Sequence, residues 1–482
     1  MKRKREVIKT KAGYNYVYIP QSQSFHLLTD ECVPYWAGDK TFDGTYASKK
    51  VEYLKNMEGI FEGEEKFITE YSPEILHRNI ANLNNLLIEV TDKCNLSCKY
   101  CGYGELYGDY DSRSNKNNSF DNVKALIDYL CQQWSSSRHL SFNKACHIGF
   151  YGGEPLMNIS LIKKTIDYLN SLCLPNGLHF EYHMTTNALL LGKYLDYIAK
   201  QKFHLLISLD GNQFNDSYRT NKKGQESFEY VVSNIHALQS KYPDYFTKYV
   251  NFNAVLHNRN SVSEIIRFIQ KEFNKIPTIA ALSTNGIKAS KKKEFWEMFH
   301  NPIESYKEAE SCDDIKDLLE KSPETSMANY FIHSYCGLTF QKYSDLFVSE
   351  KGKQYIPTGT CTPLKKKLFL TVNGKLLACE RIGQNHVLGE IRDGKVNIDF
   401  KKISTYYEKL FKKIIHLCKY CTIRKGCGFC IFHQETLEKE RICCDSFLPE
   451  SRQIPFFREH LSYFECKRET FEKVINEMIV VS

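Results

Sequence analysis

The sequence lacks the features that would direct the chain into or across a membrane. No run of about 18 apolar residues occurs, which is the length that a helix needs to cross a bilayer. The basic residues 1–9 are followed by polar residues, not by the apolar core of a signal peptide. No nucleic-acid-binding module is recognisable, and the net charge of +8 on 482 residues is modest. We therefore expect a cytoplasmic protein whose partners include neither membrane nor nucleic acid.

Cysteine, by contrast, is abundant, with 18 residues in the chain. In a chain of this length they are too dilute for a small disulfide scaffold. Without a signal peptide they favour a reducing compartment and metal ligation. The hydrophobic fraction of 42% and the charged fraction of 25% are typical of a globular protein, and the length allows two or three domains.

Three of the cysteines follow an apolar run in the stretch LLIEVTDKCNLSCKYC, residues 86–101. The apolar run predicts a strand, and Cys94, Cys98 and Cys101 have the spacing C-x3-C-x2-C. Iron–sulfur clusters are held by cysteine thiolates, so three thiolates on a four-iron cluster leave one iron open to another ligand. A partial zinc site, or three incidental thiols, is the alternative interpretation.

This stretch resembles the signature of radical S-adenosylmethionine (radical SAM) enzymes, C-x3-C-x-aromatic-C, with Tyr100 as the aromatic residue. Its form T-x-K-C-N-L-x-C-x-Y-C is similar to the subgroup that modifies peptides and proteins. The resemblance implies a [4Fe-4S] cluster on Cys94, Cys98 and Cys101, whose open iron binds S-adenosylmethionine. It also implies reductive cleavage to a 5'-deoxyadenosyl radical that abstracts hydrogen from the substrate, with ferredoxin or flavodoxin as a reducing partner.

Strand and helix patterns alternate from residue 86 to about residue 320, which predicts an α/β fold with a parallel sheet covered by helices. Six such units match the partial (β/α)6 TIM-like barrel of the radical SAM family. Parallel barrels carry their chemistry on loops at the C-terminal ends of the strands. The predicted strands are 86–90, 147–151, 180–185, 205–209, 249–256 and 278–283, and the predicted helices include 121–133, 159–172 and 228–240.

Two of the loops after these strands resemble further family motifs. Gly152, Gly153 and Glu154, followed by proline, resemble the GGEP motif, which contacts the amino group of S-adenosylmethionine. Glycines in such a loop let backbone groups approach a ligand closely. Thr186 and Asn187 match a Thr-Asn pair near cofactor and substrate, with a turn-forming asparagine as the alternative.

The next loop contains Ser208, Asp210 and, downstream, Arg219. In peptide-modifying family members the matching serine bonds the ribose and the arginine pairs with the methionyl carboxylate. A guanidinium suits that task because its fork can donate two parallel bonds. We interpret Asp210 as a turn-stabilising residue outside the catalytic set.

The residues before the barrel, 1–84, predict a small α+β domain. Residues 14–19 and 25–28 read as a strand pair across a polar turn, and residues 48–61 read as a helix. This arrangement resembles the winged-helix-like leader-peptide recognition element of peptide-modifying enzymes, which binds its peptide by strand addition. A plain N-terminal extension packed on the core is the alternative.

The C-terminal third carries a second group of cysteines. An apolar hairpin with an Asn-Gly turn separates Cys361 from Cys379 and brings them together. The spacing resembles the SPASM extension of peptide maturases, which holds two auxiliary iron–sulfur clusters, although x2 stands where the family has x3 before Cys430. By position, the resemblance assigns Cys361, Cys379 and Cys430 to the first cluster, with Cys336 as a candidate fourth ligand. It assigns Cys418, Cys421, Cys427 and Cys444 to the second cluster. We prefer Cys444 to the neighbouring Cys443 as the last ligand. Structural zinc is the alternative.

Glu380 directly follows Cys379. In the related anaerobic sulfatase maturases an aspartate at that position takes a proton from the substrate. Glu380 is therefore the candidate catalytic base, although it is one methylene longer, and a surface glutamate is the alternative.

These observations predict three regions: an N-terminal domain over 1–84, a radical SAM core over 85–320, and a polar bridge with the SPASM domain over 321–482. The predicted function is a radical SAM oxidoreductase that modifies a ribosomally made precursor peptide, by a thioether or carbon–carbon crosslink or a similar step. A formylglycine-forming sulfatase-maturating enzyme and a catalytically silent peptide-binding scaffold are the alternatives.

Overall fold

The computed structural model describes residues 6–19, 23–60, 66–139, 145–174, 177–315, 318–319, 323–336, 354–424, 427–434, 437, 439–444 and 446–477. No helix within these ranges is both long and apolar enough to cross a membrane. The predicted helix end at residue 61 and the predicted boundary at residues 320–321 lie outside the described residues.

A ten-stranded sheet forms the body of the molecule, in the order β10-β9-β8-β7-β6-β5-β12-β13-β14-β15. Six consecutive strands of it pair in parallel, which confirms the predicted partial barrel. Strand β5, in the middle of the sheet, is almost wholly buried because side chains cover both of its faces, as its continuous apolar run predicts. These strands are β5 (Asn85–Thr91), β6 (Ala145–Gly152), β7 (His179–Thr186), β8 (His204–Ser208), β9 (Val250–Leu256) and β10 (Thr278–Ala281).

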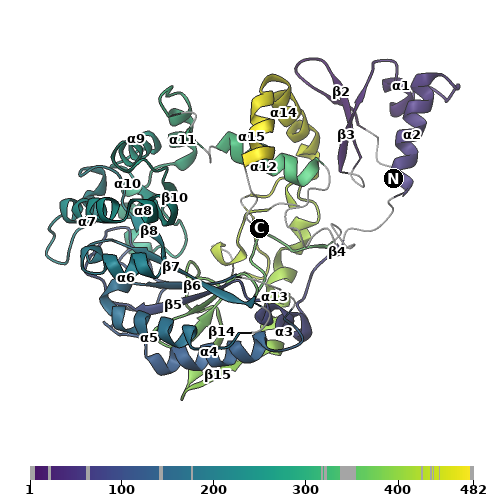
Figure 1. Ribbon diagram of the computed structural model, residues 1–482. Coiled ribbons are helices and arrows are strands. Elements are labelled where there is room, and N and C mark those ends of the chain that lie inside the picture. Colours follow the sequence, from purple (N-terminus) through teal and green to yellow (C-terminus); the bar gives the residue numbers. More distant parts are fainter. Residues whose placement is uncertain are drawn as a thin grey trace.

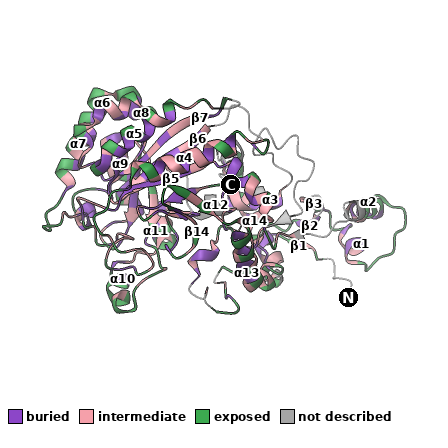
Figure 2. Cartoon of the chain, turned by 90° about the horizontal axis from the view of Figure 1, so that it is seen from below, coloured by how far each residue is buried: buried purple, intermediate pink, exposed green. Residues whose placement is uncertain are grey.

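Helices cover the outer side of the parallel strands (Figure 1). They are amphipathic and place their apolar sides on the strands, with polar sides toward solvent. Figure 2 shows buried residues along the strands and exposed ones on the outward sides of the helices. The covering helices are α4 (Phe120–Trp134), α5 (Ile159–Asn170), α6 (Leu195–Lys200), α7 (Phe228–Lys241), α8 (Pro243–Tyr249) and α9 (Val262–Phe273).

The sheet continues past the barrel through the C-terminal hairpin. β12 (Leu368–Leu370) pairs in parallel with β5, and β13 (Lys375–Leu377), β14 (Val387–Arg392) and β15 (Lys395–Ile398) follow in antiparallel order. The hairpin between Cys361 and Cys379 is thus present as predicted, but it extends the barrel sheet across the expected boundary between core and C-terminal domain. The domain limits themselves stay predictions.

The N-terminal region forms a three-stranded antiparallel sheet, β1 (Ile8–Lys9), β2 (Asn15–Ile19) and β3 (Ser24–Leu28), with helices α1 (Val33–Ala37) and α2 (Tyr46–Ile60). Side chains alternate along β2, so the sheet has two apolar faces. Val17 and Ile19 pack against α1 and α2. Tyr16 and Tyr18 face the C-terminal helices instead.

Three helices, α12 (Pro323–Tyr335), α14 (Gln453–Cys466) and α15 (Arg468–Glu477), lie between the barrel and the N-terminal sheet (Figure 1). Aromatic rings join them to the sheet: the rings of Tyr18 and Phe457 are 4.8 Å apart, and those of Phe25 and Phe331 are 5.3 Å apart. A fourth helix, α13 (Phe400–Cys418), packs on α3 (Pro73–Ala81).

The composition of the stretch from residue 284 is polar and by itself indicates a bridge between domains, but the stretch contains folded elements. It forms α10 (Lys292–Met298) and α11 (Pro302–Glu310), and α11 packs on α9. Ile315 and Leu319 are buried in the main hydrophobic core. Charged residues on the exposed sides of these segments dominate the composition, while a few well-spaced apolar residues make the contacts with the core. Composition alone therefore indicated a solvated linker.

Candidate functional site

One cavity of ≈ 760 Å³ lies at the C-terminal ends of the barrel strands. It gathers the residues predicted to bind S-adenosylmethionine and the three cysteines of the predicted core cluster from four separate loops. Parallel strands place all of these loops at one edge of the sheet, so residues far apart in the sequence meet there. The cavity is lined by Cys94, Cys98, Tyr100, Cys101, Gly152, Gly153, Glu154, Thr186, Asn187, Ser208, Arg219 and Glu380.

The loop with the three cysteines is fastened by backbone hydrogen bonds to the segment after β8. The amide of Ser97 donates to the carbonyl of Thr220 at 2.7 Å, and the amide of Lys99 donates to the carbonyl of Tyr218 at 3.2 Å. This pairing brings Arg219 beside Cys98. Burial raises the pKa of Cys98 to about 12, partly offset by Arg219. A metal that replaces the thiol proton would therefore be needed to hold this sulfur as a thiolate.

The thiols are spaced too widely for a single tetrahedral ion. No three of the described cysteines have sulfur atoms that all lie within 4.8 Å of one another. A zinc ion with Zn–S bonds of about 2.3 Å would hold its sulfurs only about 3.8 Å apart. Three thiols at wider spacing beside an open cavity fit a multi-iron cluster better than the zinc alternative.

The two glycines after β6 are required by close backbone packing. A Cβ atom on Gly152, whose φ is +137°, would lie 2.0 Å from the carbonyl oxygen of Thr91, and one on Gly153 would lie 2.0 Å from that of Lys93. The amides of Gly153 and Glu154 donate to those same carbonyls, at 2.9 and 2.8 Å. These amides therefore fix the cysteine loop, and the contact of this motif with S-adenosylmethionine stays a prediction.

The Glu154 carboxylate joins two loops of the cavity. It accepts bonds from the Thr186 hydroxyl and the Asn187 amide, both at 2.8 Å, and from the amide of Leu156 at 3.1 Å. Burial raises its pKa to about 7. The Asn187 side chain in turn donates to Asn95 at 2.8 Å, within the cysteine loop. Glu154 and Asn187 thus hold the loops in register, and their contacts with a cofactor stay predictions.

Asp210 is the centre of a buried network, not only a turn residue as we had interpreted it. It is fully buried and accepts the Tyr100 hydroxyl and two nitrogens of Arg219, at 3.0 and 3.1 Å. Although burial alone would raise its pKa, Arg219 and His257 lower it. Two of the Arg219 donors are therefore already engaged, and its pairing with the methionyl carboxylate of S-adenosylmethionine stays a prediction. Ser208 lies at the cavity wall, in register with Asn253.

Glu380 lies at the wall of the cavity next to Cys379. Its carboxylate pairs with the Lys367 ammonium at 2.7 and 2.9 Å, and its side chain is 11% exposed. Burial raises its pKa, but Lys367 outweighs that effect and lowers it. The side chain is thus a deprotonated carboxylate, the form that a base requires, although its role stays a prediction.

Four C-terminal cysteines line a second, much smaller cavity of ≈ 20 Å³. They come from the end of α13 and from the segments that follow it. Burial raises the pKa of the thiol at the end of α13, Cys418, and each of the other three thiols raises it further. The four thiols are those predicted for the second auxiliary cluster: Cys418, Cys421, Cys427 and Cys444. Cys443 is exposed, which supports the choice of Cys444.

The predicted ligands of the first auxiliary cluster are spread more widely. Cys361 and Cys430 are close enough for Cys361 to raise the pKa of Cys430, after burial. Cys379 lies against the main core, with Glu380 and Lys367 around its thiol. Cys336 packs among the aromatic residues of α12 and α14. Ligation by these four residues stays a prediction.

The sequence patterns missed Arg113 as well as Asp210. The Arg113 guanidinium donates to the Cys101 sulfur at 3.4 Å and lies 4.6 Å from the Tyr103 ring centre. It lines the cavity, and its Nε is buried without a hydrogen-bond partner. Asp210 could have been found from its place directly after β8. Arg113 lies in a loop without periodicity, where no sequence signal indicates which way a side chain points.

Comparisons with known proteins agree with this geometry. A model of the radical SAM superfamily matches residues 88–271. The chain is 26% identical over 178 residues to the radical SAM cyclopropyl synthase TigE of Paramaledivibacter caminithermalis, over 35% of this chain and 34% of that protein. It is 22% identical over 384 residues to the serine-type anaerobic sulfatase-maturating enzyme of Klebsiella aerogenes, over 74% of this chain and 82% of that protein.

A solved structure, native anSMEcpe with bound AdoMet and Cp18Cys peptide, aligns with a TM-score of 0.51 at 17% identity, over 82% of this chain and 99% of that one. At this identity the likeness concerns the fold. The chain spans a third to a half of the length of several curated relatives, so the activity of the whole protein is a matter of proposal. The three-cysteine loop, the partial barrel and the radical SAM match over residues 88–271 make this chain a relative of radical SAM enzymes, among them the anaerobic sulfatase-maturating enzymes.

Proposed function

We propose that the protein is a radical SAM maturase that modifies a ribosomally made precursor peptide. The observation that carries this proposal is the single cavity into which the three cysteines and the loops after β6, β7 and β8 converge. When bound, a [4Fe-4S] cluster and S-adenosylmethionine supply hydrogen-atom abstraction through reductive cleavage of the sulfonium. Cys94, Cys98 and Cys101 would hold the cluster, and ferredoxin or flavodoxin would supply the electron.

The protein's own residues orient the cofactor and shape the site. Glu154 keeps the second and third loops together, and Asp210 fixes the positions of Tyr100 and Arg219. Ser208 at the cavity wall would bond the ribose. A cavity of ≈ 760 Å³ leaves room beside the thiols for the cofactor and one substrate side chain, which supports a peptide that enters from outside.

The N-terminal sheet supports the leader-recognition role. β3 stands at the end of its sheet, and Leu27 on it is 47% exposed although it is apolar. An extended peptide can add to such an edge by main-chain hydrogen bonds. The aromatic packing on α12 and α14 would hold this sheet at a fixed distance from the cavity.

The decisive experiment measures 5'-deoxyadenosine. The protein is purified without oxygen, reconstituted with iron and sulfide, reduced and given S-adenosylmethionine. We expect 5'-deoxyadenosine from the wild type and from Cys173→Ala, whose residue is exposed and lines neither cavity, but none from Cys98→Ala. Absence of the product from the wild type would support the alternative of a silent peptide-binding scaffold.

The position of Glu380 favours a second candidate, a sulfatase-maturating enzyme. Its deprotonated carboxylate lines the cavity, as a base for a substrate thiol or hydroxyl would. Two assays separate the candidates: mass change of a sulfatase-type peptide, and crosslinking of a precursor encoded beside the gene. Glu380→Gln should leave 5'-deoxyadenosine formation within about twofold, because it does not contact the three cysteines. If Glu380 is the base, the same variant loses peptide product.

A further inference from the structure

A cluster of three potential metal ligands lies outside the cofactor cavity, on β6 and β7. Nδ1 of His147 is 2.9 Å from Nε2 of His183 and 3.2 Å from a carboxylate oxygen of Glu181. These three atoms all lie within 4.8 Å of one another, and no other such group of three occurs among the described residues. Two imidazoles and one carboxylate are a common ligand set of divalent transition metals.

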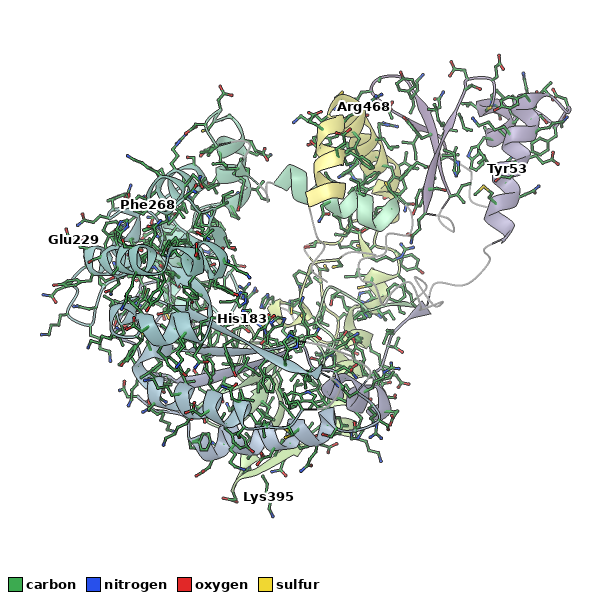
Figure 3. All side chains as sticks on the ribbon, viewed as in Figure 1. Tyr53, His183, Glu229, Phe268, Lys395 and Arg468 are labelled. Carbon is green, nitrogen blue, oxygen red and sulfur yellow. The ribbon has the colours of Figure 1, made fainter. Side chains whose placement is uncertain are left out.

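The strands themselves bring the three side chains together. β6 and β7 pair in parallel with His147 opposite Glu181, and His183 lies one side-chain position further along the same face. Alternate residues such as Cys146, Ile148 and Tyr182 point the other way, into the core under the helices. The cluster therefore lies on the concave inner side of the barrel, where Figure 3 shows His183.

The cluster is separate from the cofactor site. Tyr151, on the same strand and face, lines the cofactor cavity and comes four residues after His147. At about 3.3 Å per residue the two positions are about 13 Å apart along β6. The cluster thus lies toward the N-terminal end of the strands, away from the loops that carry the chemistry.

The spacing of the ligand atoms matches a bound ion. In a tetrahedral zinc site with bonds of about 2.0–2.1 Å, neighbouring ligand atoms lie about 3.3 Å apart. Without an ion, Nδ1 of His147 faces two acceptor-bearing groups but has at most one proton to share between them. A metal ion would satisfy all three atoms at once.

Neighbouring groups hold the cluster in place. The ring of His204 on β8 stacks on that of His183, with centres 4.6 Å apart and planes inclined by 15°. The side chains of His147 and Glu181 are 38% and 39% exposed, so an ion can reach them from solvent. Residues on paired strands are held more rigidly than loop residues, which favours a preformed site.

We propose that His147, Glu181 and His183 form a binding site for a divalent transition-metal ion of the zinc type, independent of the iron–sulfur clusters. Nδ1 of His147, Nε2 of His183 and one carboxylate oxygen of Glu181 ligate the ion, and water completes its coordination. The site ties β6 to β7 on the inner wall of the barrel. This inference does not depend on the proposed peptide substrate.

Zinc content of the reconstituted protein tests the site. The holoprotein is incubated with Zn²⁺ and desalted, and zinc and iron are then measured by mass spectrometry. We expect wild type to hold about one zinc ion more than His147→Gln/His183→Gln, at equal iron content. The matched control is His236→Gln. His236 on α7 pairs with Glu272 on α9 at 2.8 Å, and their side chains are 42% and 36% exposed, similar to those of His147 and Glu181. This variant should keep the extra zinc.

Equal zinc in the wild type and the double variant would overturn the proposal, as would an equal loss from His236→Gln. Should the double variant fail to fold by circular dichroism, Glu181→Gln replaces it, because the amide keeps the shape of the side chain. Loss of an outer-shell partner lowers metal affinity roughly tenfold, so loss of the direct ligand Glu181 should lower zinc affinity by more than that. An unchanged zinc affinity of Glu181→Gln would equally overturn the proposal.

Discussion

The two cysteine-lined cavities differ in the space that they leave beside the thiols. Cys94, Cys98 and Cys101 stand at the edge of a cavity of ≈ 760 Å³, whereas the four C-terminal thiols around Cys427 enclose ≈ 20 Å³. Three thiolates on a four-iron cluster leave one iron without a protein ligand, and the open space beside them allows a reactant to bind there. Four thiolates ligate every iron and leave no such position. We therefore propose that the first site performs the chemistry and that the second serves structure or electron transfer.

The strongest test of this comparison removes one thiol from each cavity. Cys98→Ala should abolish 5'-deoxyadenosine formation, because no other residue replaces that ligand. Cys427→Ala should lose about four iron atoms per chain but keep 5'-deoxyadenosine formation. Iron content and product are measured on the same anaerobic samples. A Cys98→Ala protein that still cleaves S-adenosylmethionine would reverse the roles of the two cavities.

A second test uses one glycine that packs against the cysteine-bearing backbone of each cavity. A Cβ on Gly153 would lie 2.0 Å from the carbonyl of Lys93, and one on Gly359 would lie 1.9 Å from that of Cys427. Gly153→Ala should weaken S-adenosylmethionine binding on the order of tenfold, about 1.4 kcal/mol, because the cysteine loop must shift. Gly359→Ala should instead lower iron content at unchanged affinity for S-adenosylmethionine.

The glycine test has a control in the chain. A Cβ on Gly224 would meet nothing within 4 Å, and its φ of +78° imposes only backbone strain on a substitution. Gly224→Ala should therefore cost stability without changing iron content or affinity. A similar loss of affinity in all three alanine variants would show that close packing of the loops is not what matters.

A third test concerns the buried ion pair under the open cavity. Asp210→Asn removes the closer of the two carboxylates beside the buried Arg219 charge and leaves only Asp216, at 3.4 Å, so we expect the free energy of unfolding to fall by about 3 kcal/mol. Asp196→Asn removes a surface pair with Lys241, whose side chains are 71% and 54% exposed, and should cost less than about 1 kcal/mol. Chemical denaturation of the two variants measures both values. Equal losses would contradict a supporting role for Asp210.

The smallest expected effect is a pH dependence of stability near the open cavity. Burial raises the pKa of Glu89 to about 7, and its carboxylate accepts the amide of Val372 at 2.9 Å. The folded state therefore holds a proton that the unfolded state releases above its usual pKa. The contribution of Glu89 to the free energy of unfolding is complete at low pH and is lost as the pH rises through 7. We expect the free energy of unfolding to fall by about 1 kcal/mol between pH 6 and pH 8.

Glu89→Gln tests this effect, because glutamine keeps the hydrogen-bond acceptor but does not titrate. The free energy of unfolding of this variant should change less between pH 6 and pH 8 than that of wild type, in urea titrations at the two values. An identical pH dependence in both proteins would show that Glu89 does not titrate in this range.

Much of the fold followed from local patterns. Continuous apolar runs and helical periodicity indicated β5 to β10 and, between them, the helices α4, α5 and α7, because burial of these elements depends on their own sequence. The motif loops could be placed at one edge because parallel strands all end there. The extension of the sheet through β12 could not be predicted, since pairing between residues 86 and 368 depends on contacts far apart in the chain.

The sequence by itself indicated the cofactor class, because the stretch with Cys94, Cys98 and Cys101 and the loops that follow resemble the motifs of radical SAM enzymes. Only the tertiary structure decided the partners of buried charges: that Asp210 engages Arg219 and Tyr100, that Lys367 neutralises Glu380, and that His147 meets His183 across two strands. The physical reason is that short-range patterns fix which face a residue occupies, whereas register between elements fixes which side chain stands opposite.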